Sequence, residues 1–338
     1  MSTKANILAK LTLVIPTYNR QSFALRNMRF WNKREASVHI LDGSQKPIPT
    51  EELQEFNPNI HYHHLPVTMV ERLAMATELV SNEYTILLAD DEFHMPKAIE
   101  SSIEELQCDK NLQACIGRSL GFEWSAGQMV SWPFYPEQRD YAILQDSAIE
   151  RMIHHMTHYT PSIIYSVVRT EIWKKALNTF LQRDFPIFGI GEIQFELSVC
   201  YLGKSKVIPA LMWLRGRENP SMHGSEPHMD PNNSFSDWWT DDSKSQEREE
   251  MLQLMASNLS QSDDRGYLEV KEEINQSLEA YNKFLFRYQK GKDWFCSQPL
   301  VKKPLWETAN LMRSSGISVD FECLREIESL VSAFHQKN

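Results

Sequence analysis

The sequence predicts an α/β fold: a mostly parallel, Rossmann-like sheet flanked by helices, with a mainly helical C-terminal extension. Two observations lead to this prediction. Short apolar runs alternate with helix-like segments over the first 110 residues, which is typical of a parallel sheet whose crossovers cover both faces. From about residue 226 the composition becomes polar and rich in Pro, Asn and Ser, and residues 245–338 have a mostly helical pattern. We therefore divide the chain into 1–225 and 226–338.

Each element follows from its local pattern. The continuous apolar run at 11–16, closed by Pro16, predicts a strand buried on both faces, and a helix with apolar spacing follows it up to residue 31. Further strands are expected at 37–44, 59–65 and 84–90, and helices at 69–81 and 95–107. The aromatic stretch at 122–136 is less regular, as are 163–177 and 191–203, and a late strand begins near residue 205. The order predicts a doubly wound sheet, which binds ligands beyond the carboxyl ends of its strands.

Composition excludes several classes of protein. The net charge of −10 argues against a protein that holds nucleic acid through bulk charge, because phosphate binding requires clustered Lys and Arg. The five cysteines form no CxxC pair, which fits reduced thiols in the cytoplasm. No segment reaches the ~18 apolar residues of a membrane span, and the N-terminus is a poor signal peptide. We expect a cytoplasmic protein, with peripheral contact at the inner face of the membrane left open.

Acidic residues follow two of the predicted strands. Asp90, Asp91 and Glu92 form a run directly after the strand at 84–90, where carboxylates make a good site for Mg²⁺ or Mn²⁺. The alternative is a solvated acidic turn before a helix. Asp42 follows the second strand and can accept a hydrogen bond from a base or a ribose, or form an Asx turn. The chain lacks GxxxxGK[ST], so P-loop chemistry is not expected.

Three ordered motifs carry a resemblance to a known family. "LTLVIPTYNR", "LDGS" and "EYTILLADDEF" together resemble the family 2-like GT-A glycosyltransferases, in particular a bacterial subgroup with an ADDDF-type DxD motif. The resemblance covers about residues 11–225. It implies a GT-A fold and a metal-dependent enzyme that transfers a sugar from a nucleotide-sugar donor, with UDP favoured, to a saccharide or lipid-linked acceptor. Inversion at the anomeric carbon, a role in surface polysaccharide assembly, and Mn²⁺ or Mg²⁺ as cofactor are further implications.

The resemblance also implies roles for residues of this chain. The residues expected to bind the nucleotide or the donor are Pro16, Thr17, Tyr18, Asn19, Arg20, Asp42, Arg72, Asp90, Asp91, Arg215 and Arg217. The expected metal ligands are Asp90, Glu92 and His223, with Glu92 replacing the usual last Asp. Arginines suit diphosphate because they bind its oxygens in a bidentate manner. An ordinary charged surface loop is the alternative for the segment at 214–224.

An inverting transferase also needs a base for the acceptor hydroxyl. In "FGIGEIQFEL" we favour Glu192, with Glu196 one turn later as its substitute, against the alternative of an amphipathic helix with solvated acids. His154 and His158 share a helical face without an HExxH pattern, and we expect them to be structural. Tyr135 and its aromatic neighbours fit core packing better than a sugar-stacking acceptor surface.

Two other functions stay open at this point. A sugar-nucleotide pyrophosphorylase-like enzyme has a related sheet, but its Gly-rich first loop is replaced here by "PTYNR". A non-catalytic sugar-binding protein on the same fold is opposed by the intact acid run. Residues 226–338 fit packing on the catalytic domain, acceptor binding or a homodimer contact.

Overall fold

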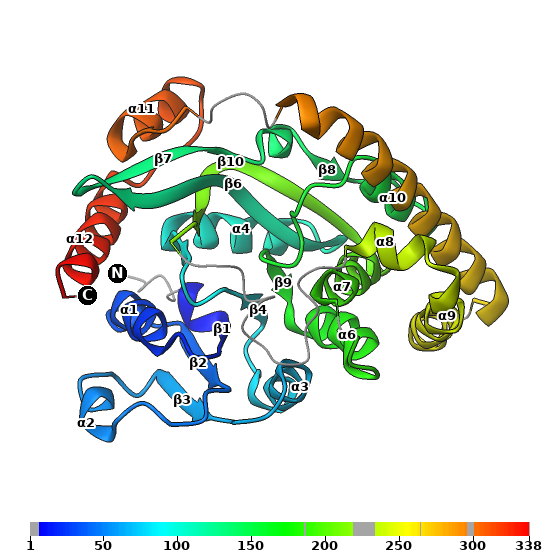
Figure 1. Ribbon diagram of the computed structural model, residues 1–338, viewed down its shortest axis with the longest axis horizontal. Helices are drawn as coiled ribbons and strands as arrows, with labels where there is room; N and C mark the ends of the chain where they lie inside the picture. Colours follow the sequence, from blue (N-terminus) through cyan, green and yellow to red (C-terminus); the bar gives the residue numbers. More distant parts are fainter. Residues whose placement is uncertain (1–6, 186, 219–233, 264, 296–300, 338) are drawn as a thin grey trace.

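The fold is built on one large mixed sheet with helices on both of its faces (Figure 1). The computed structural model describes residues 7–185, 187–218, 234–263, 265–295 and 301–337. Four parallel strands form one part of the sheet, in the order β3-β2-β1-β4: β1 Leu11–Thr17, β2 Ser37–Asp42, β3 Ile60–His64 and β4 Tyr84–Leu87. Every residue of β1 is buried, as expected for an apolar run covered on both faces.

Antiparallel pairings extend the sheet beyond β4. The further strands are β5 Phe93–His94, β6 Leu112–Ser125, β7 Gln128–Phe134, β8 Ala142–Ile143, β9 Val167–Arg169, β10 Lys204–Gly216 and β11 Lys303–Pro304. β9 joins β4 to β6 by antiparallel pairing on both sides, β10 runs parallel to β6, and β5 and β8 pair antiparallel with β10. The sheet is therefore parallel around β1 and mixed around β6.

The sequence did not reveal the hairpin of β6 and β7, which occupies the stretch at 122–136 that we expected to be irregular. Its turn places Ala126 and Gly127 at φ of 49° and 79°, the left-handed pair typical of tight hairpins. Most residues of β6 are buried on both faces, so its apolar residues do not alternate with polar ones. That loss of alternation hides the strand from pattern reading.

Helices connect the strands and cover the sheet. They are α1 Gln21–Trp31, α2 Thr50–Leu53, α3 Met69–Leu79, α4 Pro96–Cys108, α5 Ala148–Thr157, α6 Thr170–Leu181, α7 Phe188–Leu202, α8 Phe235–Thr240, α9 Ser245–Ser260, α10 Tyr267–Phe295, α11 Leu305–Ser314 and α12 Phe321–Lys337. A capping box between Thr68 and Glu71 starts α3, and Pro96 opens α4. None of the helices in the described ranges is long and apolar enough to cross a membrane.

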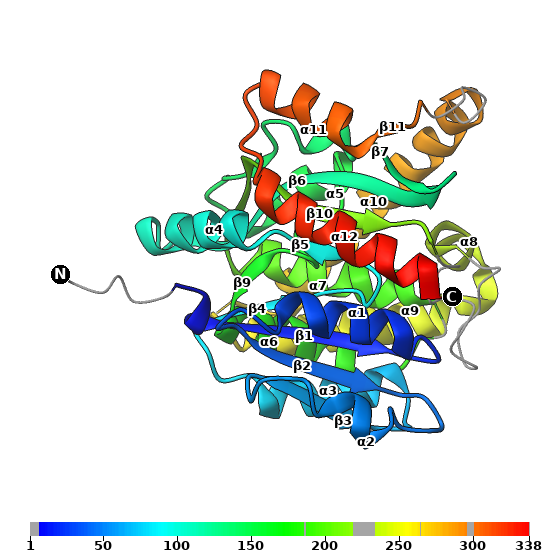
Figure 2. The same cartoon turned by 90° about the vertical axis from the view of Figure 1, so that its left-hand side faces the viewer.

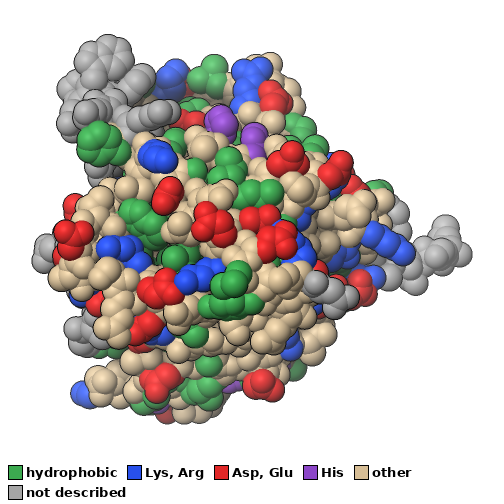
Figure 3. All heavy atoms as spheres, turned by 90° about the vertical axis from the view of Figure 1, so that its right-hand side faces the viewer, with side chains coloured by type: hydrophobic (Ala, Val, Ile, Leu, Met, Phe, Trp, Pro, Cys, Tyr) green, Lys and Arg blue, Asp and Glu red, His purple; other side chains and the backbone are tan. Residues whose placement is uncertain are grey.

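The C-terminal part is helical, and it packs on the rest of the chain. Leu324 and Ile327 of α12 belong to the hydrophobic core that also contains α1, and Leu278 of α10 belongs to the core on the other side. α12 lies beside α1 (Figure 2), where Arg34 and Glu326 form an ion pair of 2.7 Å. On the face that carries α9 and α10, acidic and basic side chains are interspersed (Figure 3).

Candidate active site

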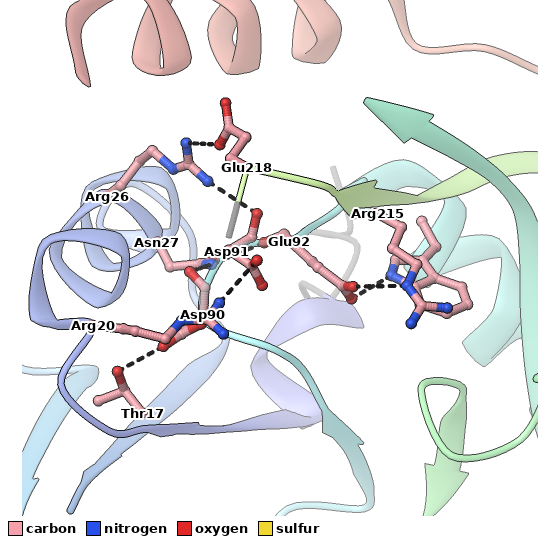
Figure 4. Close-up of polar contacts among 10 residues, drawn as sticks. Thr17, Arg20, Arg26, Asn27, Asp90, Asp91, Glu92, Arg215 and Glu218 are labelled. Carbon is pink, nitrogen blue, oxygen red and sulfur yellow. Dashed lines mark hydrogen bonds and ion pairs between the residues drawn. The ribbon is translucent and has the colours of Figure 1, made fainter. Parts of the chain in front are cut away.

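The acid run lies between β4 and β5, almost completely buried. Asp90 has no exposed surface, and Asp91 and Glu92 are 7% and 5% exposed. The Thr17 hydroxyl donates a hydrogen bond of 2.7 Å to Asp90 Oδ2. Arg20 Nη2 lies 2.6 Å from Asp90 Oδ1 and 2.8 Å from Asp91 Oδ2, so one guanidinium pairs with two carboxylates. Figure 4 shows Thr17 and Arg20 on one side of the run and Arg215 on the other.

Helix α1 holds the backbone of the acid run in place. The Asn27 side-chain amide donates to the carbonyl oxygens of Asp90 and Glu92, both at 2.8 Å. Arg26 Nη2 donates to the Asp91 carbonyl at 2.9 Å, and Arg26 Nη1 pairs with Glu218 at 2.7 Å (Figure 4). We did not predict Arg26 or Asn27. Polar residues on the buried face of an apolar helix were the only signal that could have found them.

Strand β10 supplies the partners of Glu92. The Trp213 indole N–H donates to Glu92 Oε2 at 2.6 Å, and Arg215 Nε lies 3.5 Å from Oε1. The Arg215 guanidinium also donates to the hydroxyl of Tyr135. Arg217, by contrast, is exposed and lies over the ring of Trp132 at 5.7 Å. Of Arg215 and Arg217, Arg215 is thus the one that the structure brings to the acid run.

Burial weakens the acidity of two members of the run. It raises the pKa of Asp90 to about 7, against the lowering effect of Arg20, and Asp91 raises it further. Burial also raises the pKa of Glu92 to about 8, with Arg215 acting in the opposite direction. Both carboxyl groups therefore hold a proton more tightly than an exposed acid does.

Carboxylate oxygens are suitable donors for Mg²⁺ or Mn²⁺, and the raised pKa values of Asp90 and Glu92 agree with that chemistry. Within the described ranges, however, no three His, Cys, Asp or Glu side chains come together as a complete metal site. His223, the third predicted ligand, lies outside those ranges. In the structure the oxygens of Asp90 lie against Thr17 and Arg20, and those of Glu92 lie against Trp213 and Arg215.

The predicted loop after β1 is fixed by neighbours from three elements. Asn19 has a left-handed φ of 54°, and its N–H donates to Ser44 Oγ at 2.8 Å. Arg72 of α3 is 1% exposed and donates to the carbonyls of Thr17 and Leu41. Arg72 thus stabilises the backbone of the loop from the protein interior, and through that backbone it fixes the position of Tyr18. Tyr18 itself is half-buried, with its ring 6.0 Å from the Arg72 guanidinium carbon.

Asp42 is fully buried at the end of β2. Its carboxylate accepts hydrogen bonds from Gln21 Nε2 and the Tyr62 hydroxyl, both at 2.6 Å, and from the Ser44 N–H at 2.8 Å. The bond from the Ser44 N–H is the Asx-turn contact that the sequence analysis gave as the alternative role for Asp42. An ionised carboxylate has about four lone-pair positions, so one remains for a further donor.

The two predicted bases have different environments on α7. Glu192 is partly exposed, and the Tyr159 hydroxyl donates to its Oε1 at 2.9 Å. Burial raises the pKa of Glu192 to about 7; Glu196 raises it further, and the bond from Tyr159 lowers it.

Glu196 is fully buried, 2.7 Å from His155 Nε2, and accepts the backbone N–H groups of Ile163 and Ile164 at 3.3 and 3.0 Å. Those three partners surround the carboxylate of Glu196 and separate it from solvent. Of the two predicted bases, Glu192 is therefore the one that solvent can reach, whereas the carboxylate of Glu196 is enclosed by the protein.

Tyr165 lies between the acid run and Glu192. Burial raises its pKa well above the usual value, and the charges of Glu192, Glu92 and Asp91 add to that effect. Its ring centroid is 4.7 Å from that of Trp213, the donor to Glu92. We did not predict Tyr165, because a tyrosine inside the apolar stretch "IIYSVV" carries no signal of its own. The acid run and Glu192 therefore both act electrostatically on the hydroxyl of Tyr165.

Comparisons with known proteins agree with this architecture. No family model and no curated protein matches the chain. Among solved structures, the crystal structure of S. aureus TarS residues 1–349 is similar with a TM-score of 0.52 at 12% identity, over 83% of this chain and 73% of that chain. The same TarS fragment in complex with UDP-GlcNAc is similar with a TM-score of 0.51 at 11% identity, over 81% of this chain and 73% of that chain. The likeness confirms the predicted fold class, a GT-A-type sheet flanked by helices with a helical C-terminal part.

Proposed function

We propose that this protein is a glycosyltransferase that moves a sugar from a nucleotide-sugar donor, with UDP as the nucleotide, to a hydroxyl of a saccharide or lipid-linked acceptor. The main support is a pair of features: a buried acid run at the carboxyl end of β4, and a partly exposed carboxylate at Glu192, both of which raise the pKa of Tyr165. A fold similar to that of a protein crystallised with UDP-GlcNAc adds to this support.

The loops at the ends of β1 and β2 would hold the nucleotide. Tyr18 offers a half-buried ring for stacking on a base. Asp42, which is fully buried and accepts three hydrogen bonds, would hold Gln21 and Ser44 in place around the base. Asp90, fixed by Thr17 and Arg20, would contact the ribose or the donor sugar. Because Arg72 and Ser44 fix the loop beforehand, little ordering is needed on binding.

Transfer requires positive charge to stabilise the leaving diphosphate, and a base to accept the proton of the acceptor hydroxyl. Arg215, beside Glu92, would face the diphosphate oxygens. Asp90 and Glu92, with His223, would hold Mn²⁺ or Mg²⁺, whose charge stabilises the same leaving group. Glu192 would accept the proton of the attacking hydroxyl. Direct attack of that hydroxyl on the anomeric carbon gives inversion of configuration there. A place in surface polysaccharide synthesis is part of the proposal and rests on the sequence resemblance.

Calorimetric titration of UDP, with and without Mn²⁺, tests this function. We expect binding that Mn²⁺ strengthens and that Asp90→Asn abolishes, while the exposed control Glu171→Gln binds like the wild type. Retained Mn²⁺ dependence in Glu92→Gln would remove Glu92 from the metal site. If UDP binds under neither condition, the transferase proposal is wrong.

A further inference from the structure

A groove of about 680 Å³ lies beside the candidate active site. Its walls come from the segment 135–142, the C-terminal end of α5, the loop at 159–161 and the middle of α10. Its volume lies within the roughly 300–1,000 Å³ that is typical of small-molecule sites. α10 contributes one wall, so the C-terminal extension helps to form a cavity that the first 225 residues alone would leave open.

Two tyrosines connect the groove to the proposed catalytic residues. Tyr135 accepts a hydrogen bond from Arg215, which pairs with Glu92. Tyr159 donates to Glu192 at 2.9 Å. Both tyrosines also line the groove. A molecule in the groove therefore contacts the two tyrosines that are bonded to the proposed base and to the arginine that would face the diphosphate.

Aromatic rings dominate the walls of the groove. They belong to Tyr135, Tyr141, Tyr159, Tyr281 and Phe284. Tyr159 and Tyr281 pack edge to face with centroids 4.9 Å apart, and this packing fixes the orientation of both rings. Aromatic faces present a rigid, apolar surface with negative charge above the ring, which suits the C–H faces of pyranose rings.

Polar groups at the rim are mixed in sign. The acids Glu137 and Asp140 outnumber Arg139, and all three are exposed. Burial lowers the pKa of His154, so its ring is neutral at pH 7 and can both donate and accept. A phosphate-rich ligand requires an excess of cations, which the lining of this groove does not provide. The combination favours an uncharged ligand with many hydroxyl groups.

We infer that this groove binds the neutral saccharide portion of the acceptor, stacking its sugar rings on the aromatic walls and presenting a hydroxyl to Glu192. The inference rests on the proposed function and names the chemical class of its acceptor. It also gives α10 a role in substrate binding through Tyr281 and Phe284.

The chain offers a matched pair of variants on α10. Phe284 lines the groove, whereas Phe286, two residues along, is 56% exposed and is not part of the lining. Phe284→Ala should therefore weaken saccharide binding, and Phe286→Ala should not. His158 lines the groove and is exposed, so His158→Ala gives a second variant that is expected to fold normally.

The experiment is a glycan array of neutral and acidic oligosaccharides, followed by calorimetry with the best neutral binder and with decyl phosphate as a lipid-phosphate probe. UDP affinity is measured on the same preparations. We expect neutral glycans to bind the wild type and Phe286→Ala equally, and at least about tenfold more weakly to Phe284→Ala and His158→Ala, with UDP affinity within twofold throughout.

Three results would overturn the inference: no neutral glycan binds, only acidic glycans or decyl phosphate bind, or both groove variants bind glycan like the wild type. Loss of UDP binding is a separate outcome, because it counts against the transferase function. If UDP binds and neutral glycans do not, the proposed function stands and the groove assignment is wrong.

Discussion

The proposed donor side, at the acid run, and the proposed acceptor side, at Glu192, are built in different ways. Around the acid run, Asn27 and Arg26 fix three consecutive backbone carbonyls, and Arg20 pairs with two carboxylates at once. Glu192, in contrast, is partly exposed and has a single hydrogen bond among those the structure shows, from Tyr159. The comparison suggests that one half is fixed before binding to hold a constant ligand, whereas the other is open to an acceptor of variable shape.

The largest expected effect is on the open side. Glu192→Gln removes the proposed base, and the rate of transfer should fall by about 10²–10⁴-fold with little change in UDP affinity. Initial rates and calorimetry on the same protein measure both quantities. Glu171→Gln on the exposed surface of α6 is the control. A rate within threefold of the wild type would show that another group accepts the proton.

Substitutions around the acid run should lower the stability of the protein. Asn27→Ala leaves the buried carbonyls of Asp90 and Glu92 without their side-chain donor, and we expect the free energy of unfolding to fall by about 2–4 kcal/mol. Denaturant unfolding measures it. Asn178→Ala removes an exposed bond to Asn258 and should cost less than about 1 kcal/mol. Equal losses in the two variants would contradict the proposed difference in rigidity.

Gly43 tests the support beneath the nucleotide loop. A Cβ at this position would lie 2.6 Å from the guanidinium carbon of Arg72, so Gly43→Ala should displace Arg72 from the carbonyls of Thr17 and Leu41. We expect a loss of about 1–3 kcal/mol in stability and weaker UDP binding. Thermal unfolding and calorimetry provide the readouts. Gly266→Ala is the control, because a Cβ there meets no atom within 4 Å.

The pH dependence of Glu192 gives an effect similar in size to that of Gly43→Ala, but present only at high pH. A base with a pKa of about 7 is ionised only above that pH, so activity should rise as pH increases through 7. The folded state holds this proton more tightly than the unfolded state, so Glu192 lowers stability as pH rises from about 4.5 to about 7. Glu192→Gln should therefore be more stable than the wild type at pH 8, by about 1–3 kcal/mol, and equal to it at pH 4. Unfolding at the two pH values checks the sign.

Tyr159→Phe sharpens the same test. It removes the hydrogen bond that lowers the pKa of Glu192, so the rise in activity should move to higher pH. A purely structural role of Tyr159 would reduce the rate without moving the pH profile.

Sequence patterns predicted the parallel half of the fold well. The run at 11–16 and the acids at 90–92 lie where we expected, because a buried strand excludes charge and a strand end tolerates it. The β6–β7 hairpin was missed because β6 contains glycines and polar residues along a mostly buried strand, so it shows neither a continuous apolar run nor a regular alternation. Arg72 was placed correctly in α3, but only its depth in the structure shows that it supports the loop from below.

By itself, the sequence determined the α/β class, the order of the first strands and the position of the acid run, since all three depend on local apolar runs and on the polar residues that end them. Only the tertiary structure decided the partners of those acids, because Arg20, Trp213 and Arg215 reach them from distant parts of the chain. It also decided which acid on α7 is accessible, and it joined α10 to the 135–142 segment to form the groove. Contacts of this kind depend on how elements pack, which local periodicity does not encode.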